Sequence, residues 1–402
     1  MAGHLSGWLA RLAFLIAAVA GSASSALTAQ ARREPFEWPR IGAGGSLPRL
    51  DLRRDPDLQI GTAVGPVETV FSGIAGAVRL VSGDIVIGDA GNHRLLYFGA
   101  RGDFLRSVGR RGAGPGEFTD IRWLGRCANG ALAVQDGTRG ALAVFASAGR
   151  YLRSDPFPPD VHFDQVLWCS GSGRLLMLLN GTWRSRVEPG QYLSTETVLI
   201  GVHGNRVDTV AHPGLQDYYV AKKVAAFGSV PLGRRVLASA GGGRIYHCTN
   251  REARCVVTDT APGAAATTFA IPLTRRRVRD GDWASVVAAY VTADPDRGVR
   301  KRLAAVVDEL APKTEFPLLD RVQADAGGNL WVRTFDNFGT EAASWVIVTP
   351  RGTPIGFVAA PRPLRITEIG VDYVLGFSED TDGVERVELY LFARFLSAKP
   401  RG

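Results

Sequence analysis

Short runs of strand-forming residues recur along the chain, each opening at a glycine or an acidic turn residue. Their starting positions are Gly83, Gly130, Gly173, Gly243, Gly328 and Asp372, which gives intervals of 47, 43, 70, 85 and 44 residues. Three of these intervals have the length of a propeller blade built from four strands. Several runs are followed by a second apolar run that ends in a glycine turn, as strands joined by tight turns require. The pattern predicts an all-β, six-bladed β-propeller.

The two ends of this repeat region complement each other. Leu58–Thr62 resembles Phe104–Gly109, the expected outer strand of the first blade, while residues 364–395 hold three strand-like runs and lack an outer one. Joining the chain ends in one sheet would remove the open seam of the ring. We therefore expect the propeller to occupy residues 53–396, with 32–52 as a flexible leader and 397–402 as a tail.

A helical pattern interrupts the strands between the fourth and fifth runs. Apolar residues recur at helical spacing in two groups, which are Trp283, Val286, Val287, Tyr290 and Val291, and then Val299, Leu303, Val306, Val307 and Leu310. Such stripes predict amphipathic helices. We expect a helical hairpin, residues 280–311, inserted between blades four and five, where it either braces the propeller or covers its channel as a lid.

The N-terminal residues have the features of an export signal. Arg11 precedes the apolar run Leu12–Ala20, and Ala29-Gln30-Ala31 fits a small-x-small cleavage site. The run is too short to span a bilayer, so residues 1–31 predict a signal peptide, with an uncleaved anchor helix as the alternative. No later segment has 18 consecutive apolar residues. We expect a monomer without a membrane span, located in the periplasm or secreted.

Composition changes this picture little. The chain has 402 residues and a formal net charge of +8, and only five of its 47 basic residues are Lys. This Arg bias is typical of GC-rich bacterial genomes, so the basic character alone identifies no partner. The four cysteines suit disulfides in an exported chain. Cys248 and Cys255 flank a polar turn and suit a hairpin disulfide, while Cys127 and Cys169 stand one repeat apart and suit a bridge between adjacent blades.

One segment carries a family resemblance. Asp89 is followed by Asn92-His93 and an apolar strand, and Gly112–Phe118 follows as a linker. These residues resemble the NHL repeat, and the chain as a whole resembles NHL-repeat and TolB-like six-bladed propellers. The match covers roughly residues 76–125, and the other blades share only the spacing of the strand-like runs. The resemblance implies a propeller with a binding role, in which His93 packs at a blade hairpin.

Candidate chemistry lies where the inner strands are expected to begin. Polar residues precede the glycines of four repeats, and the candidates are Asp120, Arg122, Asp164, Gln165, Asp320, Arg321 and Glu368. If all inner strands start at one face, these side chains converge there and suit a polar or charged ligand. Alternatively, they pair with one another and hold the blades together.

Two functions from different classes follow. The first is a binding or scaffold module for a peptide, glycan or protein partner of the cell envelope, which needs no cofactor. The alternative is a metal-dependent hydrolase or lyase, similar to propeller lactonases, in which Asp120, Asp164, Asp320 and Glu368 would hold a divalent metal. The basic run Arg275–Arg279 would suit a nucleic acid. The export signal argues against that partner, and we expect no nucleic acid to bind.

Overall fold

The computed structural model describes residues 47–52, 55–157, 165–180, 188–204, 206–223, 226–261, 263–279, 281–292, 297–335, 342–361 and 363–392. All of them belong to one compact unit, residues 34–402. The predicted signal peptide, the first part of the leader and the tail lie outside the described residues. No helix in the described ranges is long and apolar enough to cross a membrane.

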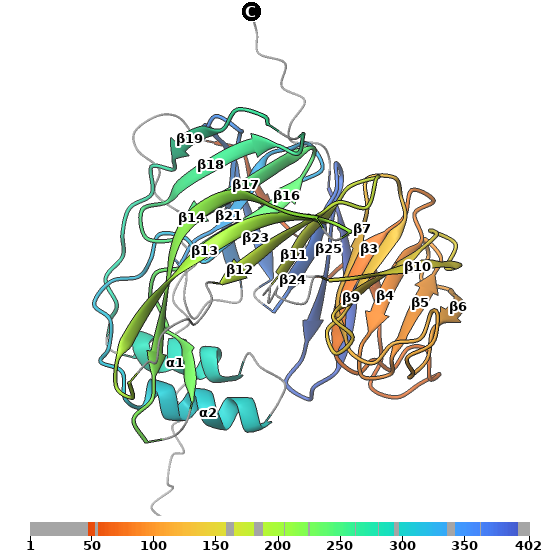
Figure 1. Cartoon of the computed structure of the whole chain (residues 1–402), viewed down its shortest axis with the longest axis horizontal. Coiled ribbons are helices and arrows are strands. Elements are labelled where there is room, and N and C mark those ends of the chain that lie inside the picture. The colour runs from red at the N-terminus through yellow and green to blue at the C-terminus, as the bar shows by residue number, and fades with distance from the viewer. Residues whose placement is uncertain are drawn as a thin grey trace, which may run out of the picture. The chain divides into compact units, whose positions relative to one another are not determined.

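Six sheets make up the described chain (Figure 1). Blade one contains β3 (Ile74–Arg79), β4 (Ile85–Asp89), β5 (Arg94–Phe98) and β6 (Phe104–Val108). Blade two contains β7 (Ile121–Arg126), β8 (Leu132–Asp136), β9 (Ala141–Phe145) and β10 (Tyr151–Pro156). Blade three contains β11 (Gln165–Cys169), β12 (Leu175–Asn180), β13 (Tyr192–His203), β14 (Arg206–Val220) and β15 (Phe227–Ser229).

The remaining sheets complete the ring. Blade four contains β16 (Val236–Gly241), β17 (Arg244–Thr249), β18 (Arg254–Asp259) and β19 (Thr267–Ala270). Blade five contains β20 (Arg321–Ala324), β21 (Leu330–Arg333), β22 (Ala342–Val348), β23 (Pro354–Pro361) and β1 (Arg49–Asp51). Blade six contains β24 (Arg365–Ile369), β25 (Tyr373–Glu379), β26 (Glu385–Leu391) and β2 (Leu58–Ile60). The predicted six-bladed propeller is confirmed.

The core is divided into layers between neighbouring blades. For example, Leu95, Tyr97 and Leu132 belong to the layer between blades one and two, whereas Leu96 belongs to the layer between blades six and one. In blades one and two the second strand packs on both of its faces, so β4 and β8 are buried along their whole length. This two-sided burial explains why each of these strands begins with three consecutive apolar residues in the sequence.

The ring closes through a sheet that combines both ends of the propeller. β2 pairs antiparallel with β26, with Leu58 opposite Leu389 and Ile60 opposite Val387. The Ile60 side chain is 3% exposed and lies in the layer between blades six and one. The N-terminal strand therefore completes blade six, as its likeness to an outer strand indicated.

The C-terminal end of the expected leader, residues 32–52, forms a strand in the structure. β1 pairs in parallel with β23, with Arg49 opposite Phe357, and thus adds a fifth strand to blade five. Leu52 follows it and is buried at 8% exposure. This end of the expected leader, residues 49–52, thus belongs to the propeller through backbone pairing and apolar burial.

Both helices lie in the connection between β19 and β20. The prediction had placed them only coarsely, between blades four and five. α1 (Asp282–Thr292) and α2 (Arg297–Val307) carry the two apolar stripes. They pack on blade three, where Val306 and Val307 meet Tyr219 and Val230. Figure 1 shows the helices beside the ends of the long strands β13 and β14. Among the described residues, none of either helix lines the channel cavity described below, and this placement favours the interpretation of the helices as a brace.

Two disulfides join the four cysteines. Cys127 directly follows β7 of blade two, and Cys169 is the last residue of β11 in blade three. Their bond therefore links adjacent blades. Cys248 and Cys255 face each other across β17 and β18. The pairing is the one that the spacing of the cysteines suggested.

Candidate functional site

A cavity of about 460 Å³ lies at the centre of the ring. All of the inner strands contribute to its wall, which are β3, β7, β11, β16, β20 and β24. The wall is formed mainly by the middle and the later residues of these strands. Its volume is in the range typical of small-ligand pockets.

The cavity wall combines aromatic and hydrogen-bonding side chains. Trp123 and Trp168 come from blades two and three, Gln165 and Gln323 supply amides, and Glu368 supplies a carboxylate. Trp123 bends over Gly125, where a Cβ atom would lie only 2.1 Å from the indole ring. A glycine at that position is therefore needed to seat the tryptophan against the wall.

Glu368 is held by three different blades. Its Oε1 accepts hydrogen bonds from Arg126 Nη2 at 2.7 Å and from the Tyr373 hydroxyl at 2.9 Å. Its Oε2 accepts the backbone N–H of Arg79 at 2.8 Å. Blade six thereby binds blades one and two beside the cavity, and the Arg79 guanidinium lies 4.7 Å from the centre of the Tyr373 ring.

The protonation states of this cluster follow from its contacts. Burial opposes the charge of Arg126, but the hydrogen bond and the charge of Glu368 outweigh it and raise the pKa of Arg126. Burial, together with the charge of Glu368, also raises the pKa of Tyr373. Near neutral pH the phenol therefore stays protonated and donates its hydrogen bond to the Glu368 carboxylate, while Arg126 supplies the positive charge of the ion pair.

The other sequence-predicted residues are distributed differently. Asp120 accepts a hydrogen bond from Arg122 Nε at 2.6 Å, and Asp320 is paired with Arg333. Neither pair lines the cavity, whereas Gln165 and Glu368 do. Asp164 lies outside the described residues. The structure thus brings only some of these candidates to one wall and pairs the described acids with arginines.

Arginines gather where the inner strands begin. Arg321 and Arg365 are the first residues of β20 and β24, and Arg235 directly precedes β16. Water reaches Arg321, but surrounding protein atoms and then the charge of Arg333 lower its pKa to about 10, with smaller contributions from Arg235 and Arg365. Arg321 remains a cation at neutral pH, so this end of the channel is positively charged.

The metal-dependent alternative needs acids that meet. Among the residues that the structure describes, no three His, Cys, Asp or Glu side chains gather where they could hold a metal ion. Glu368 is bound to Arg126 and Asp320 to Arg333 instead. The described residues therefore do not fit the metal site that a lactonase-like mechanism requires.

Sequence reasoning missed Trp123, Trp168 and Arg126, which all lie at the cavity. For Arg126 and Trp168 a usable signal was present, because each directly precedes a cysteine of the disulfide between blades. The basic run Arg275–Arg279 lies in the β19–β20 connection. There Arg275 pairs with Glu315 at 3.5 Å, and Arg276 covers the Phe316 ring.

Comparison with known proteins finds distant structural likeness alone. No family model and no curated protein sequence matches the chain. A candidate exported protein of Bacteroides fragilis shares 11% identity at a TM-score of 0.44, covering 86% of this chain and 100% of that one. Regucalcin, a calcium-binding protein of Agrobacterium tumefaciens, shares 12% identity at 0.40, covering 86% and 97%. Virginiamycin B lyase of Staphylococcus aureus shares 10% at 0.39, covering 83% and 99%.

Proposed function

We propose that this chain is an exported, NHL-like β-propeller that binds an acidic peptide or glycan segment of the cell envelope in its channel cavity. The observation that carries the proposal is the cavity itself, because all of the inner strands contribute to it. A ligand seated there would contact every blade of the ring. The protein acts as a binding module and needs no cofactor for this role.

The chemistry of the wall supports a ligand of this class. The faces of Trp123 and Trp168 suit stacking against sugar rings or peptide planes, since aromatic side chains give large apolar contact together with a fixed geometry. Gln165 and Gln323 offer amides that both donate and accept hydrogen bonds. The arginines at the other end of the channel would attract an acidic ligand toward it.

The proposal is tested by tryptophan fluorescence during titration with muropeptides, which contain a disaccharide and an acidic peptide. We expect saturable binding to the wild type. The variants Trp168→Phe and Gln165→Ala should each weaken it about tenfold, the effect of losing roughly 1.4 kcal/mol of contact energy. Trp283→Phe is the matched control, because Trp283 lies in α1 and outside the cavity.

Mass spectrometry of the ligand after incubation separates binding from catalysis. An unchanged ligand is expected. Cleavage that stops when a chelator is added would instead establish the metal-dependent hydrolase or lyase. Binding that is equally strong in the cavity variants and in Trp283→Phe would move the site away from the channel.

A further inference from the structure

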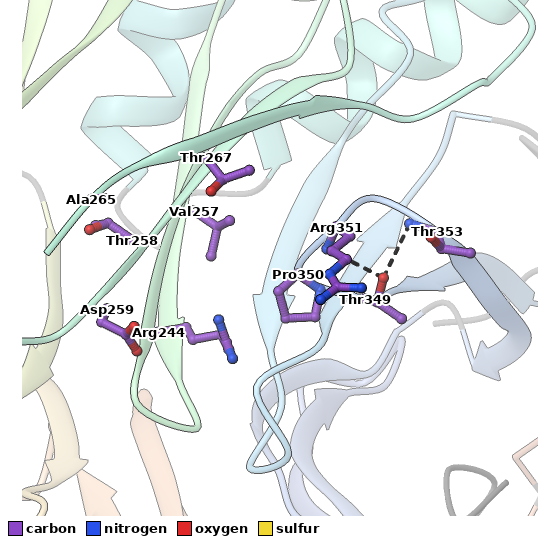
Figure 2. A pocket seen from close by; sticks show the side chains of 10 residues that line it. All are labelled: Arg244, Val257, Thr258, Asp259, Ala265, Thr267, Thr349, Pro350, Arg351 and Thr353. Carbon is purple, nitrogen blue, oxygen red and sulfur yellow. Dashed lines mark hydrogen bonds between the residues drawn. The ribbon is translucent and has the colours of Figure 1, made fainter. Parts of the chain in front are cut away.

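A second pocket, of about 700 Å³, lies at the rim, between blades four and five. Figure 2 shows its lining side chains, which are Arg244, Val257, Thr258, Asp259, Ala265, Thr267, Thr349, Pro350, Arg351 and Thr353. They come from β17, β18, β19, the connection between β18 and β19, and the turn between β22 and β23. The pocket is separate from the channel cavity, although the turn from Gly241 to Arg244 contributes to both.

Two arginines from different blades face this pocket. Arg244 is the first residue of β17, and Arg351 lies in the turn between β22 and β23. Neither makes an ion pair with another residue in the described ranges. In blade three the corresponding residue, Arg174, also follows a turn glycine, but it is bound to Asp208 at 2.5 Å. The rim pocket therefore holds two guanidinium groups that are not fixed in an ion pair, against the one carboxylate of Asp259.

The backbone holds Arg351 in place. In its turn the N–H of Gly352 donates to the carbonyl of Thr349 at 2.8 Å, and Thr349 Oγ1 accepts the N–H of Thr353 at 3.2 Å. Gly352 has a φ of +80° and packs on Phe269, where a Cβ atom would lie 2.6 Å from the ring. The turn is thus fixed against β19, and the position of Arg351 at the pocket wall follows from this packing.

The rest of the wall adds neutral and acidic hydrogen-bonding groups. Thr258, Thr267 and Thr353 supply hydroxyls, and Asp259 lies opposite Arg244 in the pairing of β17 with β18. An oxyanion would bind to the arginines, which make strong charge-assisted hydrogen bonds with such groups. The carboxylate of Asp259 accepts hydrogen bonds and so suits hydroxyls. A ligand that combines an oxyanion with several hydroxyls matches both features.

We propose that the rim pocket is a second binding site, specific for saccharides that carry an oxyanion, such as uronic acid units. The oxyanion binds between Arg244 and Arg351, and sugar hydroxyls bind to Asp259 and to the threonines. This proposal depends on residues of blades four and five outside the channel and stands whether or not the channel binds a ligand.

Isothermal titration calorimetry with trigalacturonate tests the site, with neutral maltotriose as the ligand control. We expect trigalacturonate alone to bind, with an affinity that falls as salt is added. Arg351→Gln should weaken binding about tenfold, which corresponds to roughly 1.4 kcal/mol. The matched control is Arg101→Gln, because Arg101 holds the same place before the turn glycine Gly102 in blade one and is exposed. This control should bind as the wild type does.

Two outcomes would overturn the proposal. An equal loss of trigalacturonate affinity in Arg351→Gln and Arg101→Gln would mean that the net positive charge of the protein, and not the pocket, attracts the ligand. Loss in Trp168→Phe but not in Arg351→Gln would place the saccharide in the channel, which would support the channel proposal and exclude the rim site. Because Arg351 is exposed, its substitution is expected to leave the melting temperature unchanged, and a second variant, Arg244→Gln, tests the opposite wall.

Discussion

At the scale of the residue, a single carboxylate connects three blades. Glu368 of β24 binds Arg126 of β7, the backbone of Arg79 in β3, and Tyr373 of β25. The side chains of Arg126 and Glu368 are only 32% and 18% exposed, so solvent screens their attraction incompletely. A polar residue expected to meet a ligand is thus also a structural link, which is the alternative that the sequence left open.

Replacing Glu368 with Gln should lower the free energy of unfolding by about 2 kcal/mol, because Arg126 then loses its partner while water still partly solvates it. Urea unfolding measures this change. The control is Asp120→Asn, whose partner Arg122 is 66% exposed; the expected loss there is under about 1 kcal/mol. Equal effects in the two variants would show that Glu368 does not hold the blades together.

A second residue introduces a pH dependence. Burial lowers the pKa of His247 in β17 to about 4, against 6.5 for a free histidine. Between these values the unfolded chain binds a proton that the folded protein does not, so stability is complete above pH 6.5 and decreases as the pH falls toward 4.

From pH 7 to pH 5 the contribution of His247 should amount to about 2 kcal/mol. The measurement is the loss of unfolding free energy over this interval in the wild type and in His247→Gln. The variant should lose about 2 kcal/mol less. The exposed His203 at the end of β13 provides the comparison, and His203→Gln should retain the full loss. The same loss in all three proteins would rule out His247 as its source.

At the scale of the element, the repeat was predictable because the turns between strands require glycine at fixed positions. Gly83 and Gly328 have φ values of +91° and +79°, which favour glycine over other residues. The helices were predictable from their apolar periodicity. Their contact with β14 and β15 was not, because it joins segments far apart in the chain.

The long strands of blade three could not be predicted from local signals. The 70-residue interval between the repeats of blades three and four results from β13 and β14, with 12 and 15 residues, and from the added strand β15.

The residues of the cavity wall could not be predicted from the strand pattern either. Bulges occur between Ile121 and Trp123 in β7 and between Ile366 and Glu368 in β24. A bulge disturbs the two-residue alternation, so strand pattern alone does not say which side chains face the channel.

At the scale of the whole molecule, a short strand closes the ring. β2 has three residues, and beside it the Glu385 carboxylate accepts the N–H groups of Gly73 and Ile74 at 2.6 and 2.9 Å. Blades six and one are therefore joined at the same seam by apolar packing and by hydrogen bonds from backbone N–H groups of one blade to a carboxylate of the other.

Ile60→Ala should lower the free energy of unfolding by about 3 kcal/mol, since it removes buried methyl groups from this seam. Hydrogen exchange should become faster in β26, which pairs with β2. Leu105→Ala is the control, because Leu105 lies in an outer strand of blade one and is 43% exposed; the expected change is under about 0.5 kcal/mol. If the seam does not support the ring, the two variants will lose equally little unfolding free energy.

The pairing of β2 with β26 also sets an order of events during synthesis. β2 is among the first strands of the propeller to leave the ribosome and β26 is the last, so their sheet must wait until almost the whole repeat region has been made. Contacts between such distant segments form slowly. Until then the apolar seam faces of blades one and six remain open to other chains. The nascent protein would thus gain from a chaperone, or from delayed folding, until its final strand arrives.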